Sequence, residues 1–238
     1  MQSDCVARAS GTDIVQIQNV VKEYNLGKTV VPALRGVSLD IRSGDFMTVA
    51  GPSGSGKTTL LNLIGCVDVP TSGEVLVGGE STSVLSEKEL TKLRLHRLGF
   101  IFQTFNLIGV LSTYHNVEFP LLLKGMSDRK ARRDRVMNLL QRVGLETHAR
   151  HRPNELSGGQ RQRVAIARAL VTEPCIVLAD EPTANLDSIT GEQIIDLMKE
   201  INEREKTTFI FSTHDQRVME HAHRIVKLVD GRIAEDDR

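Results

Sequence analysis

The chain has 238 residues, enough for one large domain, or for a domain with an inserted subdomain, built around a substantial core. Apolar residue types make up 40% of it, which is typical of a folded protein and excludes a disordered one. Thirty Lys and Arg balance thirty Asp and Glu, so no overall field attracts nucleic acid or an anionic membrane, and we expect no nucleic-acid partner.

The sequence shows neither a membrane span nor a secretion signal. The longest apolar runs, such as 175–179, have the length of a strand and fall short of the roughly 18 residues of a spanning helix. Polar residues 1–12 are expected to form a flexible tail before one domain at 13–238. The cysteines are odd in number and widely spaced, which favours neither a disulfide framework nor a zinc site and suits a reducing cytoplasm. They are Cys5, Cys66 and Cys175.

Strand and helix patterns alternate along the chain, which predicts an α/β fold with a parallel or mixed sheet covered by helices. Two short runs, 46–50 and 175–179, are almost entirely apolar and are expected at the centre of the sheet, because strands buried on both faces have this composition. Further strands are expected at 14–21, 37–41, 208–212 and 224–229.

Between about 85 and 155 the sequence becomes charged and helix-prone, which predicts an inserted helical subdomain. Its basic run, 129–135, is interrupted by an Asp and lacks aromatic residues. A solvated helix face is therefore a better interpretation of this run than a nucleic-acid patch.

A glycine-rich loop follows the apolar run 46–50 and precedes a helix-like stretch at 59–65. Its residues fit the phosphate-binding P-loop pattern, in which inward-facing backbone N–H groups and a helix N-terminus hold a triphosphate. The lysine would pair with the β and γ phosphates, and the threonine hydroxyl would bind Mg²⁺. The alternative is an ordinary glycine-rich turn. The loop comprises Gly51, Pro52, Ser53, Gly54, Ser55, Gly56, Lys57 and Thr58.

The second apolar run ends in two adjacent carboxylates, Asp180 and Glu181. In P-loop NTPases an Asp at this point supports Mg²⁺, and a Glu one residue later can polarise the attacking water. The alternative is a pair of acids that caps the following turn.

A third motif, Leu-Ser-Gly-Gly-Gln at 156–160, opens another helix-like stretch. A hydroxyl, exposed N–H groups and the helix dipole would favour an anion there, although Ser-Gly-Gly by itself is an ordinary N-cap. The expected nucleotide-binding residues of this motif are Ser157, Gly158, Gly159 and Gln160.

These three motifs, in this order, resemble the ATP-binding cassette (ABC) ATPases, and the likeness extends along almost the whole chain. It implies a P-loop NTPase core, an antiparallel β portion near the N-terminus and the helical subdomain at about 85–155. It also implies ATP and Mg²⁺ as cofactors.

The resemblance assigns further residues. Tyr24 matches the aromatic that stacks on adenine, Gln103 the glutamine that senses Mg²⁺ or the attacking water, Asp187 the D-loop aspartate and His214 the switch histidine, while Thr59 belongs to the nucleotide site. The alternatives are a half-buried surface tyrosine, a polar strand end and a core histidine. The expected catalytic residues are Lys57, Gln103, Glu181 and His214, and the expected metal-binding residues are Thr58, Gln103 and Asp180.

Within the family, the sequence is similar to ATPases of the lipoprotein-release and macrolide-exporter (LolD/MacB-like) type. This implies a head-to-tail homodimer in the ATP state, with each ATP between the P-loop of one subunit and the 156–160 motif of the other. Because the chain has no span, we expect a separate integral-membrane permease and a cytoplasmic location, peripheral on the inner face of the cell membrane. The alternatives are a cell-division-like regulatory ATPase and a soluble ABC ATPase.

The segment after Gln103 carries apolar residues in a loop context: Phe105, Leu107 and Ile108. We expect them to help form a groove that receives a short cytoplasmic helix of the permease. Packing in the core of the insertion is the alternative.

Overall fold

The computed structural model describes residues 12–27 and 29–237, so all but the last residue of the expected tail lie outside the described residues. The first sheet is antiparallel, as expected near the N-terminus, and its strand order is β2-β1-β4-β5. The strands are β1 (Asp13–Leu26), β2 (Thr29–Arg42), β4 (Ser72–Val77) and β5 (Glu80–Ser81).

The second sheet has the order β10-β9-β3-β8-β7-β6 and is parallel except for β10. The two apolar runs form β3 and β7, each with a neighbour on both sides, as their composition predicts. Phe46, Phe209 and Phe211 pack together on one face and are fully buried. The strands are β3 (Phe46–Ala50), β6 (Leu98–Ile101), β7 (Ile176–Asp180), β8 (Thr208–Thr213), β9 (Arg224–Val229) and β10 (Arg232–Asp237).

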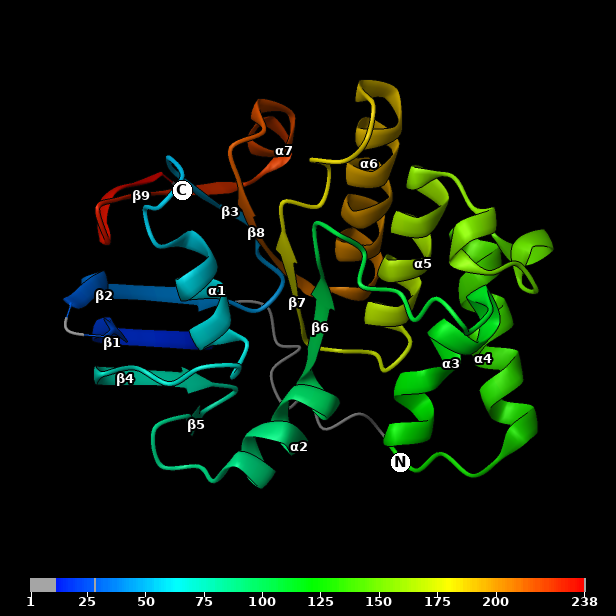
Figure 1. The fold of residues 1–238 in the computed structure, drawn as a ribbon, viewed down its shortest axis with the longest axis horizontal. Helices are drawn as coiled ribbons and strands as arrows, with labels where there is room; N and C mark the ends of the chain where they lie inside the picture. Colours follow the sequence, from blue (N-terminus) through cyan, green and yellow to red (C-terminus); the bar gives the residue numbers. More distant parts are fainter. Residues whose placement is uncertain (1–11, 28, 238) are drawn as a thin grey trace.

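Helices fill the space between and beside the two sheets (Figure 1). Helix α1 contacts strands of both sheets and buries Leu60, Leu61, Leu63 and Ile64, whereas α5 lies between β6 and α3. Two 3₁₀ turns, Glu146–His148 and Pro153–Glu155, precede α5. The helices are α1 (Lys57–Ile64), α2 (Glu87–Arg97), α3 (Thr113–Leu123), α4 (Arg129–Arg142), α5 (Gly158–Leu170), α6 (Ser188–Glu205) and α7 (Gln216–His221).

The range expected to form the helical insertion also contains a strand of the parallel sheet. Strand β6 pairs in parallel with β7 and buries Leu98 and Ile101. This strand is hard to predict because β6 has only four residues and directly follows the charged helix α2.

The basic run on α4 is less solvated than its composition predicts. Arg132 is buried, and its Nε donates to Glu118 Oε1 at 2.9 Å. Arg135 pairs with Glu173 at 3.0 Å. Two arginines of this run therefore hold α4 against α3 and the end of α5.

The cysteines depart from the expectation of a chain without disulfides. Cys66 is free and buried, and burial raises the pKa of its thiol to about 12. Cys175 is disulfide-bonded. Within the described ranges, no helix combines the length and the apolar character that crossing a membrane requires.

Candidate functional site

The glycine-rich loop joins the end of β3 to the start of α1, as the P-loop pattern requires. Gly51 has φ 152°, and a Cβ there would lie 2.1 Å from the Leu228 carbonyl oxygen. Gly56 has φ 105°, and its Cβ would lie 2.6 Å from the Ala33 carbonyl oxygen. Glycine is therefore needed at both positions for the loop to fit between β2 and β9.

The Lys57 side chain folds back onto this loop. Its Nζ donates to the carbonyl oxygens of Gly51 at 2.8 Å and Pro52 at 2.9 Å, and the residue is buried. A cation held only by neutral carbonyls can be transferred to phosphate oxygens, which make stronger charge-assisted hydrogen bonds.

The two predicted carboxylates lie at the carboxyl end of β7. The Thr58 hydroxyl donates to Asp180 at 3.3 Å, so the two expected Mg²⁺ ligands face each other across the gap between α1 and β7. Hydroxyl and carboxylate oxygens are ligands that suit Mg²⁺, which usually completes its octahedron with phosphates and water.

Glu181 is held by the end of β8. Its carboxylate accepts from the Thr213 hydroxyl at 2.9 Å and lies 2.7 Å from His214 Nδ1, while its backbone N–H donates to the Ser212 carbonyl at 2.8 Å. Its φ of 46° is a strained conformation for a non-glycine residue, of the kind that clusters at functional sites.

These groups open into one cavity of about 630 Å³ at the carboxyl ends of the parallel strands. The tertiary structure thus brings together the P-loop, Asp180 and Glu181, and it places Gln103 and His214 on the cavity wall. Four lining residues were not predicted: Val31, Pro32 and Ala33 of β2 and Ser212 of β8. The complete lining is Val31, Pro32, Ala33, Pro52, Ser53, Gly54, Gly56, Lys57, Thr58, Thr59, Gln103, Asp180, Glu181, Ser212 and His214.

Two P-loop residues predicted at the nucleotide site, Gly51 and Ser55, are not among the described residues that line the cavity. Gly51 packs against β9, and the Ser55 side chain is buried.

The 156–160 motif forms a well-capped helix start away from this cavity, since Ser157 to Gln160 are not among its described lining residues. Ser157 Oγ accepts from the Gln160 N–H at 3.3 Å, and Gln160 Oε1 accepts from the Ser157 N–H at 2.9 Å. The capping box fixes the N-terminus of α5, as the N-cap interpretation predicts. The anion-binding interpretation requires a ligand from outside this subunit.

The D-loop also caps a helix. Asp187 is the N-cap of α6 and accepts from the Thr190 N–H at 3.0 Å, and Thr190 lowers the pKa of this carboxyl. Asn185 donates to the Gln103 carbonyl oxygen at 2.8 Å, which links the D-loop to the segment after β6.

The contacts of the residues beside His214 were not predicted. Asp215 accepts from the Thr183 hydroxyl at 2.8 Å and from Arg217 Nη2 at 2.6 Å. Arg217 also donates to the Ser188 carbonyl at 3.1 Å, at the start of α6. The Ser-Thr-His-Asp sequence places an acid next to His214, but only the fold reveals its partners.

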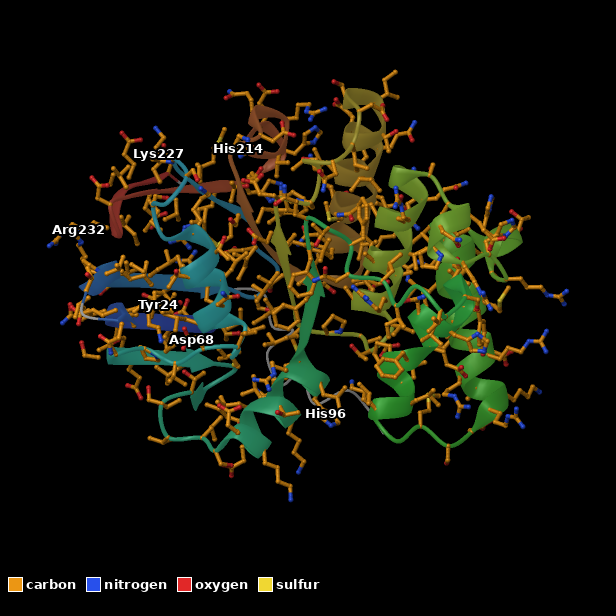
Figure 2. All side chains as sticks on the ribbon, in the orientation of Figure 1. Tyr24, Asp68, His96, His214, Lys227 and Arg232 are labelled. Carbon is orange, nitrogen blue, oxygen red and sulfur yellow. The ribbon has the colours of Figure 1, made fainter. Side chains whose placement is uncertain are left out.

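Tyr24 lies next to the cavity but is not among the described residues that line it. It pairs with Val31, a lining residue, across the β1–β2 ladder. Its hydroxyl donates to Asp68 Oδ2 at 3.0 Å, and Figure 2 places both residues next to α1.

A P-loop between β3 and α1, with two carboxylates at the end of the strand beyond β8, defines a nucleoside triphosphatase of the P-loop class. The chain belongs to the ABC transporter family, whose model matches residues 34–184. This confirms the resemblance found in the sequence.

Three relatives document the similarity. The uncharacterized ABC transporter ATP-binding protein MJ0796 of Methanocaldococcus jannaschii is 47% identical, with 94% of this chain and 97% of the relative covered. Its dimeric structure in a post-hydrolysis state bound to ADP and Pi matches with a TM-score of 0.88 over 94% of this chain and 98% of the other. The lipoprotein-releasing system ATP-binding protein LolD of Legionella pneumophila is 45% identical (92% and 96% covered). The macrolide export ATP-binding/permease protein MacB of Syntrophobacter fumaroxidans is 46% identical, with 92% of this chain but 31% of MacB covered.

Proposed function

We propose that this chain is the ATP-hydrolysing subunit that powers a membrane transport or extrusion complex through ATP-driven dimerisation. The observation that carries this proposal is the cavity itself, in which the P-loop, Asp180, Glu181 and His214 converge while the 156–160 motif lies elsewhere. One subunit holds all the groups for the nucleotide except those of the 156–160 motif.

The cavity residues and Tyr24 at the rim have separate roles in binding the nucleotide, binding the metal and directing water. The P-loop N–H groups and Lys57 bind the phosphates, and Tyr24 stacks on the adenine at the rim. Thr58 and Asp180, with Gln103, hold Mg²⁺, which neutralises phosphate charge when bound. Thr213 orients the Glu181 carboxylate, which directs the attacking water and takes up its proton.

The second subunit supplies the missing side of the site. The Gly158 and Gly159 N–H groups and the Ser157 hydroxyl lie at the start of α5, where the dipole favours a γ-phosphate. ATP therefore joins two subunits, and hydrolysis to ADP and phosphate loosens them. The dimeric MJ0796 structure bound to ADP and Pi supports this arrangement.

An apolar groove offers a docking surface for the permease. It has a volume of about 530 Å³, lies between α2, β6, α3 and α5, and includes Phe102, next to Gln103. The groove residues differ from those expected. Leu107 packs against the core, the Phe105 ring lies 5.2 Å from the Arg161 guanidinium, and Ile108 is exposed outside the groove lining. Phe102 and Leu123 line the groove instead.

A short cytoplasmic helix of the permease in this groove would contact the segment next to Gln103. Docking of the permease would thereby be coupled to closure of the ATPase dimer. Attachment in this way places the protein in the cytoplasm, peripheral on the inner face of the cell membrane. The LolD and MacB relatives support a partner of this type.

Affinity purification from membranes, with mass spectrometry of the bound integral subunit, tests the proposal. Phe102→Glu and Leu123→Glu should abolish co-purification and leave ATP binding intact, because both side chains are partly exposed in the groove. Val84→Glu is the matched control, since Val84 is 79% exposed and lies outside the groove lining. Failure of wild-type protein to retain any membrane subunit would contradict the transport role.

A further inference from the structure

We propose that Asp68, together with Lys22, is a positioning residue that fixes the Tyr24 ring for contact with the base of the nucleotide. This inference rests on the proposed function, because it takes Tyr24 as the base-stacking residue.

The three side chains form one connected cluster, of which Tyr24 and Asp68 are labelled in Figure 2. The Tyr24 hydroxyl donates to Asp68 Oδ2 at 3.0 Å, and the Lys22 ammonium donates to Asp68 Oδ1 at 2.6 Å. The same ammonium lies over the Tyr24 ring, 5.0 Å from its centroid, within the range of a cation–π contact. The ring is therefore held at its hydroxyl and on one face.

Asp68 is itself a rigid anchor. Its backbone N–H donates to the Asn62 carbonyl of α1 at 3.3 Å, and its Oδ1 accepts from the Val69 N–H at 2.8 Å. Burial acts to raise the pKa of Asp68, but the hydrogen bonds from Lys22, Val69 and Tyr24 outweigh it and lower the pKa. The carboxylate is thus ionised at neutral pH.

This cluster connects the proposed base site to the phosphate site through helix α1. The helix begins at Lys57 of the P-loop, and the Asp68 backbone is hydrogen-bonded to Asn62 of the same helix. On the other side, Tyr24 pairs with Val31 of the cavity wall. The Thr59 hydroxyl is near enough to influence the Tyr24 pKa, which burial raises.

A ring that is already fixed loses less conformational freedom when a base stacks on it. Removing the anchor should therefore weaken binding of a nucleotide but not of a ligand that has phosphates and no base. We expect a loss of about 3- to 10-fold, the cost of ordering one side chain on binding.

Calorimetric titrations with MgADP and with magnesium pyrophosphate test this inference without turnover. Tyr24→Phe and Asp68→Ala should each weaken ADP binding by about 3- to 10-fold and leave pyrophosphate affinity unchanged. The double variant should lose no more than either single one, because both remove the same hydrogen bond. Tyr24→Phe leaves the Lys22–Asp68 pair intact and so tests the anchor even if Asp68→Ala folds poorly. Asp134→Ala, an exposed carboxylate on α4, is the matched control.

Two further results separate the possible failures. If Tyr24→Ala weakens ADP binding while Tyr24→Phe and Asp68→Ala do not, the positioning role of Asp68 is overturned and base stacking stands. Equal losses for ADP and pyrophosphate in Asp68→Ala would also overturn it, since they indicate a general structural defect. If Tyr24→Ala leaves ADP affinity unchanged, base stacking and the positioning role are both wrong.

Discussion

His214 Nδ1 lies 2.7 Å from Glu181 Oε1, while the other oxygen of this carboxylate accepts from the Thr213 hydroxyl. The His214 side chain is 75% exposed, whereas that of Glu181 is only 16% exposed. The exposed ring is therefore free to turn, while Thr213 keeps the carboxylate in place. The ends of two neighbouring strands, β7 and β8, thus present this carboxylate and this imidazole side by side in the cavity.

We expect Glu181→Gln to bind ATP normally but to hydrolyse it more slowly by about 10²-fold or more, because an amide cannot accept the proton of the attacking water. Intact ATP should then hold two subunits together. A phosphate-release assay and ATP-dependent dimerisation on size-exclusion chromatography check both outcomes. Glu220→Gln, an exposed glutamate on α7, is the control. Wild-type turnover in Glu181→Gln would refute the role of this residue.

Lys57→Ala should remove most of the ATP affinity, because the P-loop loses its positive charge against the β and γ phosphates. The overall fold should persist, since Lys57 binds only carbonyl oxygens of its own loop. Nucleotide titration measures the loss, with Lys88→Ala on the exposed side of α2 as the control. Binding and hydrolysis of MgATP at wild-type levels would show that the P-loop assignment is wrong.

Ser157→Arg should leave ATP binding by its own subunit unchanged but block hydrolysis in the homodimer. The arginine would occupy the γ-phosphate position of the opposite subunit, and loss of the N-cap should cost about 1 kcal/mol of stability. Mixing Ser157→Arg with Lys57→Ala tests the shared site, because one composite site then keeps both intact halves. Restored hydrolysis supports sharing between subunits, and no restoration in confirmed heterodimers contradicts it.

Asp215→Asn should destabilise the protein by about 1.5–3 kcal/mol at pH 7, because the carboxylate accepts charge-assisted hydrogen bonds from Arg217. Arg217 lowers the pKa of Asp215, so this stabilisation is present above the unfolded-state pKa of about 3.9 and is lost as the pH falls through the folded-state value. The difference from wild type in urea denaturation should therefore shrink below about pH 4. Asp134→Asn is the exposed control, and a pH-independent difference would exclude the ion pair as the cause.

The sequence by itself determined the local features of this protein. The P-loop glycines, the Ser157 helix cap and the buried strands can be predicted because each depends on steric and hydrogen-bonding preferences over a few neighbouring residues. The family resemblance added Gln103 and His214, and the structure places both on the wall of the cavity.

Only the tertiary structure decided which distant segments meet. Strand β6 joined the central sheet from within a charged region, Arg132 became buried against Glu118, and Asp68 reached Tyr24 across 44 positions of sequence. The 156–160 motif lies apart from the cavity, as the head-to-tail arrangement implied by the resemblance requires. Strand order and buried ion pairs depend on how whole elements cover one another's apolar faces, and no local pattern encodes that long-range burial.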